Sequence, residues 1–195
     1  MPNNIQAEIL SSIADRLRRI GFRKRQMRNF VCDLEKGCTG FVGLNVAHHL
    51  GGVLEINPVV GVRIDLLEDK LSELTGRDTK KLATPTLSRN IGYWSSDYKY
   101  RTYIFSNESD INVEADRLVG ELLAIGVPAI RPFCDTNKIY SEIANPQFFN
   151  VEKRKYYEPV LIAMLGSRDK GLSEFLCARR GWVSPTIGCK TVSNK

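Results

Sequence analysis

GFVGLNVAHHLGGVLEINPVVGVRI, at residues 40–64, is the stretch that decides the fold of this chain. Its apolar and β-branched residues are typical of paired strands, and Gly51-Gly52 supplies a turn between them. After the turn, apolar side chains keep a period of two, which predicts one core face and one polar face. The polar face carries Glu55, Asn57 and Arg63. An open face would make these residues a partner-binding surface, whereas a covering helix would make Glu55 and Arg63 an internal ion pair.

The residues on either side of this stretch predict an α+β fold, an antiparallel meander packed by N-terminal and central helices. Apolar residues recur every three to four positions over 4–20 and 111–125, which indicates two amphipathic helices. Gly126 and Pro128 are expected to end the second helix. Pro58 has no N–H to donate to a ladder, so it predicts an edge, a bulge or a break. Further strands are expected at 29–34, 38–47, 87–94 and 98–106, and short helices at 65–74 and 137–144.

The length of 195 residues is enough for one sizeable core, since such a chain buries on the order of 70% of its unfolded surface. The 43% apolar and 26% charged fractions argue against wholesale disorder. We expect a single α+β domain over residues 1–181, in which 151–181 form a C-terminal helical hairpin. Residues 182–195 have little regular pattern and are expected to be a tail.

The chain is expected to be cytoplasmic. Its N-terminus lacks a basic leader followed by an apolar run, and the uncharged residues 37–54 hold Asn45, two histidines and five glycines. We therefore expect no membrane partner. Five cysteines, an odd number at wide spacing, favour reduced thiols over a disulfide framework; they are Cys32, Cys38, Cys134, Cys177 and Cys189.

The net charge of +6 arises from one basic segment, residues 16–28, which holds seven Lys and Arg and no acid. The rest of the chain has 21 bases against 22 acids. Part of the segment suits the C-terminal end of a helix, where cations interact well with the helix dipole. The segment is equally suited to an acidic protein, nucleic acid or phosphate, with Phe22 and Phe30 as neighbouring aromatics. The candidate contacts are Arg19, Arg23, Lys24 and Arg25.

Nothing in the sequence predicts a cofactor, a metal site or a catalytic residue. There is no nucleophile elbow, phosphate-binding glycine loop, H-E-x-x-H or C-x-x-C motif. Adjacent residues on a strand point to opposite faces, so His48 and His49 suit one metal only within a turn. An enzymatic alternative would need one of these histidines near Glu55 or a cysteine.

Aromatic residues gather between positions 93 and 103 and predict either a core or a contact surface. Tyrosine and tryptophan near arginine are typical interface anchors. We expect Trp94 and Tyr98 to contact a partner, and Tyr103 and Phe105 to fill the core.

The order of the segments resembles small bacterial α+β domains of unknown function, some of them similar to immunity proteins encoded beside toxins. The resemblance covers residues 1–145: an amphipathic helix, GFRKR, a strand with Phe30, GFVGLNV, a tryptophan segment, a helix and PAIRPF. Residues 51–64 and the C-terminal helices depart from that pattern. The resemblance implies a protein that binds and neutralises a toxin or another protein by occlusion. A nucleic-acid-associated or phage-defence accessory protein is the alternative, and the oligomeric state stays open.

Overall fold

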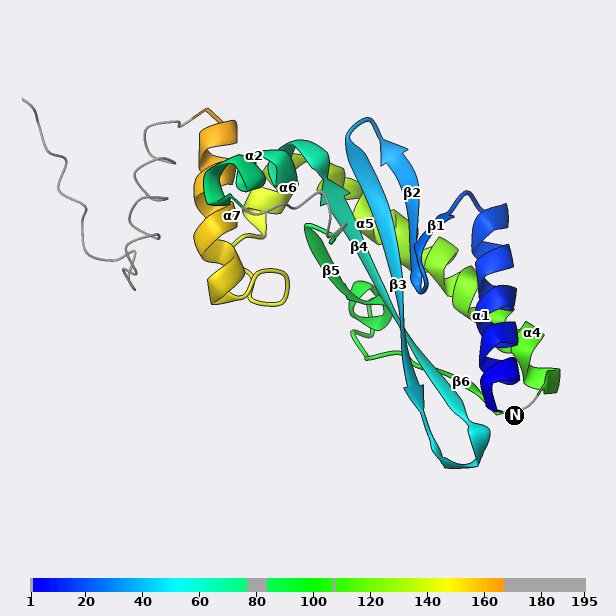
Figure 1. The fold of residues 1–195 in the computed structure, drawn as a ribbon. Helices are drawn as coiled ribbons and strands as arrows, with labels where there is room; N and C mark the ends of the chain where they lie inside the picture. Colours follow the sequence, from blue (N-terminus) through cyan, green and yellow to red (C-terminus); the bar gives the residue numbers. More distant parts are fainter. Residues whose placement is uncertain (1, 77–83, 107, 167–195) are drawn as a thin grey trace, which may run out of the picture. The chain divides into compact units, whose positions relative to one another are not determined.

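The computed structural model, drawn in Figure 1, describes residues 2–76, 84–106 and 108–166. The chain divides into two units, Met1–Glu142 and Ile143–Lys195, and each is described by itself. The single domain expected over residues 1–181 stays a prediction. The second helix of the expected C-terminal hairpin and the tail lie outside the described residues.

An antiparallel sheet forms the centre of the first unit. Its strands are β1 (Arg23–Gln26), β2 (Asn29–Glu35), β3 (Cys38–His48), β4 (Leu54–Ile64), β5 (Leu87–Asn90) and β6 (Tyr103–Phe105). The order is β1-β2-β3-β4-β5, and β6 also pairs with β4. The β3–β4 hairpin keeps its register from Cys38↔Ile64 to His48↔Leu54. Residues 40–64 are therefore the central hairpin, and the α+β fold is confirmed.

Pro58 lies inside β4, which has neither a bulge nor a break in its pairing with β3. The N–H of Leu44, the residue opposite, donates to the Arg28 carbonyl at 2.9 Å, so this pair makes no ladder hydrogen bonds. The missing N–H of Pro58 therefore points away from β3. On that side β6 pairs only as far as Ile56 and β5 begins at Val59, so no ladder needs the donor.

The helices of this unit are α1 (Pro2–Arg19), α2 (Asp65–Thr75), α4 (Glu108–Glu121), α5 (Val127–Ile130) and α6 (Thr136–Ser141). Helices α1 and α4 cover one face of the sheet, and α2 lies at the end of β4 beside Arg63. The core joins Ile13 and Leu17 of α1 and Leu118 of α4 to Val42 and Val60 of the sheet. Helices α4 and α5 pass behind the strands in the view of Figure 1.

The expected end of the central helix is wrong. A π-helical turn over Leu122–Gly126 leads directly into α5, and a 3₁₀ turn, η4, follows over Arg131–Cys134. A Cβ on Gly126 would lie 3.3 Å from the methyl groups of Val60, so this glycine permits close packing of helix and strand. Pro128 is tolerated because it stands in the first turn of α5.

Several strands and helices differ in extent from the expectation. β5 stops at Asn90, where a 3₁₀ turn over Ile91–Trp94 begins, and the strand expected over 98–106 shrinks to β6. β1 was not expected, because its four residues are all exposed and lack any apolar alternation. In the second unit α7 spans Val151–Met164, the first part of the expected hairpin, and its first turn is capped by the Asn150 side chain.

The expectation of reduced thiols fails for one pair of cysteines. Cys38 at the start of β3 and Cys134 at the end of η4 form a disulfide, with their Cα atoms 5.5 Å apart. The two residues are 96 positions apart in sequence, so the pairing becomes visible only once the fold brings η4 to the sheet. Cys32 is a buried free thiol, and Cys177 and Cys189 lie outside the described residues. Among the helices described, none has the length and apolar character to span a membrane.

Candidate interaction surface

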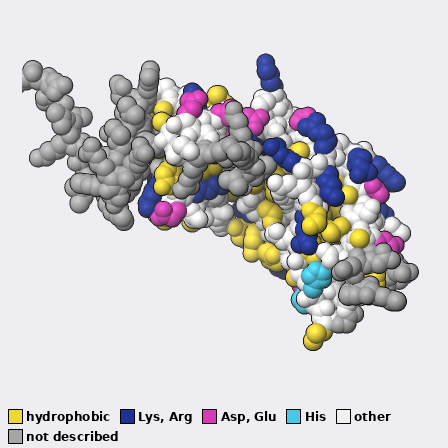
Figure 2. Space-filling view, viewed as in Figure 1, with side chains coloured by type: hydrophobic (Ala, Val, Ile, Leu, Met, Phe, Trp, Pro, Cys, Tyr) yellow, Lys and Arg dark blue, Asp and Glu magenta, His cyan; other side chains and the backbone are white. Residues whose placement is uncertain are grey.

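The sheet face opposite α1 and α4 carries the polar residues expected from residues 40–64. In β4 the even-numbered side chains enter the helix-covered core, so Glu55, Asn57 and Val59 project to the other face. These three side chains are half-buried, and Asn45 of β3 beside them is exposed. Figure 2 shows hydrophobic side chains lying among Lys and Arg over the same side of the molecule. The face around Glu55 and Asn57 is therefore open to solvent in the described part of the chain.

Arg63 does not belong to this open face, which corrects its assignment as a partner contact. Its side chain is 8% exposed, because Glu68 of α2 and Thr84 lie against it at this end of β4. The guanidinium donates to the Thr84 carbonyl at 3.0 Å and to Asp65 at 3.2 Å, and it lies 3.9 Å from the buried Glu68. Arg63 thus stabilises the fold, and its ion pair is with Asp65 and Glu68 instead of Glu55.

Glu55 and Asn57 are the polar side chains of β4 on this face. The Glu55 carboxylate lies 2.7 Å from Nε2 of His49, near the tip of the β3–β4 hairpin. Asn57 lies opposite Asn45, and its Oδ1 atom is buried with no hydrogen-bond partner. A buried amide oxygen without a donor costs stability unless a ligand or water supplies one. Glu55 therefore offers an acceptor on this face, whereas Asn57 Oδ1 is closed off from solvent in this conformation.

The loop after β5 is built as a fixed platform. The Asn90 side chain accepts hydrogen bonds from the N–H groups of Gly92 and Arg101, both at 2.9 Å, and donates to the Arg101 carbonyl at 2.9 Å. A Cβ on Gly92 would lie 1.7 Å from the Lys99 carbonyl oxygen, so only glycine fits there. In the sequence, Asn-Ile-Gly at 90–92 is the signal that could have indicated these hydrogen bonds, since asparagine side chains commonly bond to nearby backbone in turns.

This loop presents a cluster of tyrosines. The ring centroids of Tyr93 and Tyr98 are 5.0 Å apart, and those of Tyr93 and Tyr100 are 5.9 Å apart. Tyr98 is 44% exposed and Tyr100 is 54% exposed. Tyr98 also has a φ of +50°, a left-handed conformation that is unfavourable for an aromatic residue. Such strain is concentrated at functional sites, which makes this loop the leading candidate surface.

Trp94 supports the cluster from beneath. Its indole N–H donates to the Val60 carbonyl at 3.2 Å, and its ring meets Phe133 edge-on at 5.5 Å. The Arg89 guanidinium lies 4.2 Å from the Trp94 ring and 5.6 Å from that of Tyr98, and burial lowers the pKa of Arg89. Trp94 therefore anchors the loop, while Tyr98 and Tyr100 are its exposed members. Tyr103 and Phe105 are buried, as the sequence predicts.

The basic segment is divided between structural and unpaired side chains. Arg16 binds Asp116 at 2.6 Å, Arg18 binds Asp15 at 2.6 Å, and Arg23 binds Asp33 at 2.9 Å. The remaining predicted contacts, Arg19, Lys24 and Arg25, are exposed and make no ion pair with any described residue. Phe22 and Phe30 are both buried to 2% exposure, so neither offers a ring on which a base could stack.

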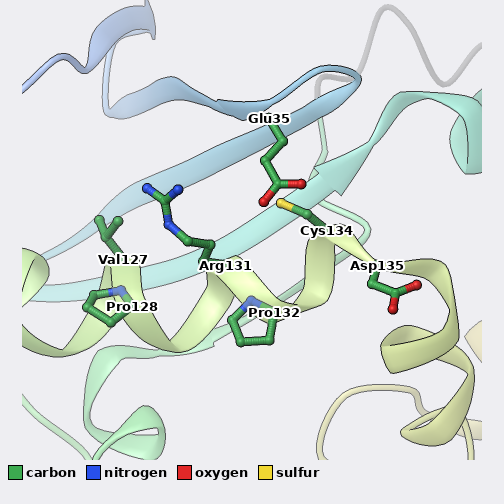
Figure 3. A pocket seen from close by; sticks show the side chains of 7 residues that line it. All are labelled: Glu35, Val127, Pro128, Arg131, Pro132, Cys134 and Asp135. Carbon is green, nitrogen blue, oxygen red and sulfur yellow. The ribbon is translucent and has the colours of Figure 1, made fainter.

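Of the groups considered for chemistry, the structure brings together His49 and Glu55, 2.7 Å apart near the tip of the β3–β4 hairpin. Cys32 is buried, and burial raises the pKa of its thiol, which opposes formation of a nucleophilic thiolate. An open pocket of about 510 Å³ is lined by Glu35, Arg131 and Cys134 with neighbouring prolines. Figure 3 shows the Glu35 carboxylate directed toward Cys134 and the Asp135 carboxylate pointing away. The Cys134 sulfur is already in a disulfide, and the described residues hold no group of three His, Cys, Asp or Glu suited to a metal.

No family model, curated protein or solved structure matches this chain. The resemblance to immunity-like domains therefore stays a prediction, and the function is argued from the geometry alone.

Proposed function

We propose that this chain binds a partner protein and neutralises it by occlusion, in the manner of a toxin-immunity protein. The observation that carries the proposal is the fixed, strained loop that exposes Tyr98 and Tyr100. Tyrosine provides large contact area at a low cost in side-chain entropy, and a loop that is already ordered loses little more on binding. Both properties favour a protein interface over a small-molecule site.

The open sheet face supports a broader footprint for the same partner. Glu55 offers an acceptor on that face, and the exposed Asn45 of β3 lies on the same face. The net charge of +6 favours an acidic partner surface and would speed the encounter.

Affinity capture with paired variants tests the proposal. We would immobilise the wild-type chain and a Tyr98→Ser/Tyr100→Ser variant and compare the proteins retained from lysate of the native host. The control is Tyr140→Ser, which removes a tyrosine of 36% exposure from α6, outside the loop. The protein retained would then be purified, and its dissociation constant and its own activity measured with each variant.

We expect the wild type and the control to bind with equal affinity and the double variant at least about 30-fold more weakly, since an interface tyrosine contributes about 1–2 kcal/mol. The partner's activity should fall on binding the wild type. A partner that binds all three proteins equally would contradict the loop as the contact surface. A bound partner that stays fully active would contradict neutralisation.

The other functions predicted from the sequence have less support. Nucleic-acid binding would draw on the basic segment, but the two aromatics of that segment are in the core. An enzymatic site would need His48 or His49 near Glu55 or a cysteine. His49 does lie 2.7 Å from Glu55, but the pocket lined by Glu35, Arg131 and Cys134 does not include this pair, and the described residues hold no metal-binding group around it. Both functions remain predictions.

A further inference from the structure

β1 forms an outer edge of the sheet. It pairs with β2, and no other described strand lies against it. All four of its residues are exposed. In an antiparallel edge strand, alternate backbone N–H and C=O groups point away from the sheet and are available to another strand.

The side chains of this edge carry uncompensated positive charge. Asp33 of β2 neutralises Arg23 across the pair. Lys24 and Arg25 follow it with no ion pair to a described residue. The register of β1 with β2 shifts between Lys24 and Gln26, so Arg25 stands at a bulge and both bases are exposed along this edge. Met27, just beyond the strand, is 71% exposed and extends the edge with an apolar contact.

These charges determine which chain can pair here. A second copy that added its own β1 would place Lys and Arg opposite Lys and Arg, and like charges directly opposite in a sheet are destabilising. An acidic segment would instead pair each base with a carboxylate. Nucleic acid would gain phosphate contacts, but it would leave the backbone groups of the edge unpaired and find no exposed ring on which to stack.

We propose that β1 binds an extended acidic segment of the partner protein by adding it to the sheet as a further strand. Backbone hydrogen bonds would supply the affinity, and Lys24 and Arg25 would select carboxylates. This inference rests on the proposed protein-binding function and names the chemistry of a second contact. It uses residues separate from the tyrosine loop, so the two proposals can fail independently.

The test is a titration of the isotopically labelled full chain with a synthetic peptide of about eight residues that alternates Glu and Thr, at about 50 mM salt. We expect backbone amide shifts concentrated at residues 23–27, with slowed hydrogen exchange of the same amides. Lys24→Glu/Arg25→Glu should weaken binding by at least about tenfold. Lys36→Glu, an exposed charge reversal in the β2–β3 turn, is the matched control and should bind as the wild type does.

Two further probes separate the alternatives. The same peptide with alternate backbone nitrogens methylated keeps its charge but loses hydrogen bonds, and it should fail to bind. A single-stranded DNA of roughly twelve nucleotides should bind more weakly than the acidic peptide. The proposal is overturned if residues 23–27 do not respond, if the methylated peptide binds equally, or if the DNA binds more tightly. Amide spectra of each variant establish that it is folded.

Discussion

Reduction of the Cys38–Cys134 disulfide is expected to lower the stability of the first unit substantially. The bond joins the start of the central hairpin to η4, across 96 positions of sequence that include β4, β5, β6 and α4. In the unfolded chain it holds these segments in a closed loop and so reduces the entropy gained on unfolding. The perturbation is Cys134→Ser, which opens the loop with little change in side-chain volume.

The magnitude follows from the size of the loop. For a separation of 96 positions, the chain-entropy relation gives a stabilisation of about 4.7 kcal/mol at 25 °C. Native bridges commonly realise about 2–5 kcal/mol, so we expect Cys134→Ser to lose about 3–5 kcal/mol. For a chain of this size the melting temperature should fall by about 6–20 °C.

Thermal and urea denaturation, each with and without reductant, measure this loss. The wild type should lose stability on reduction, and Cys134→Ser should already be at the lower value and respond no further. Cys177→Ser/Cys189→Ser is the control, because it removes two other cysteines and should leave the effect of reductant unchanged. Mass analysis of a non-reduced digest should find the peptides of Cys38 and Cys134 joined.

Two results would refute this reasoning. Titration of five free thiols in the oxidised, unfolded protein would show that the bond does not form. A joined pair of peptides with a melting temperature that reductant leaves unchanged would show that the bond forms without constraining the fold.

Further substitutions test packing and charge. Gly92→Ala should lower the free energy of unfolding by about 1–3 kcal/mol, because its Cβ would overlap the Lys99 carbonyl. Gly120→Ala, at an exposed position of α4, should raise it by about 0.5–1 kcal/mol. Equal effects of the two substitutions in urea denaturation would contradict the close packing of the loop at Gly92. Glu68→Ala should cost about 3–5 kcal/mol, because it removes the buried carboxylate beside Arg63 and leaves only that of Asp65, which is exposed; a loss below about 1 kcal/mol would contradict this. The hydrogen bond from Arg16 lowers the pKa of Asp116, so the stabilisation from this pair is present above about pH 4 and is lost as the pH falls further. Asp116→Asn should remove this part of the loss of stability in acid. An Asp116 carboxyl that titrates at its ordinary pKa would contradict the prediction.

The central architecture could be predicted because its causes are local. Period-two alternation places Glu55 and Asn57 on one face whatever the partners of β4 are, and the glycine pair marks the turn. The same rule failed to show that Arg63 is buried. The burial of Arg63 depends on α2 and Thr84, which contact the end of β4. The alternation of side chains within β4 carries no information on these contacts.

Other features depend on contacts between distant residues. Gly126 resembles a helix stop in sequence, yet it serves the approach of the helix to Val60. The disulfide needs two cysteines brought together by the whole fold. β1 has no core side of its own, so no apolar pattern predicts it. The aromatic cluster of the tyrosine loop was predicted from the sequence. The hydrogen bonds from Asn90 that fix the loop, and the left-handed backbone of Tyr98, become visible only in the structure.

Pro58 also determines how the outer side of β4 is shared. If residue 58 had an N–H, β5 or β6 could extend along β4 and pair with the residues that the other strand now occupies. A shift by two residues would keep every side chain on its present face. Proline removes the hydrogen bond that such an extension would gain. Pro58 thus divides the outer side of β4 into two pairing segments, one for β5 and one for β6. Each of these two strands therefore has a single place to end during folding.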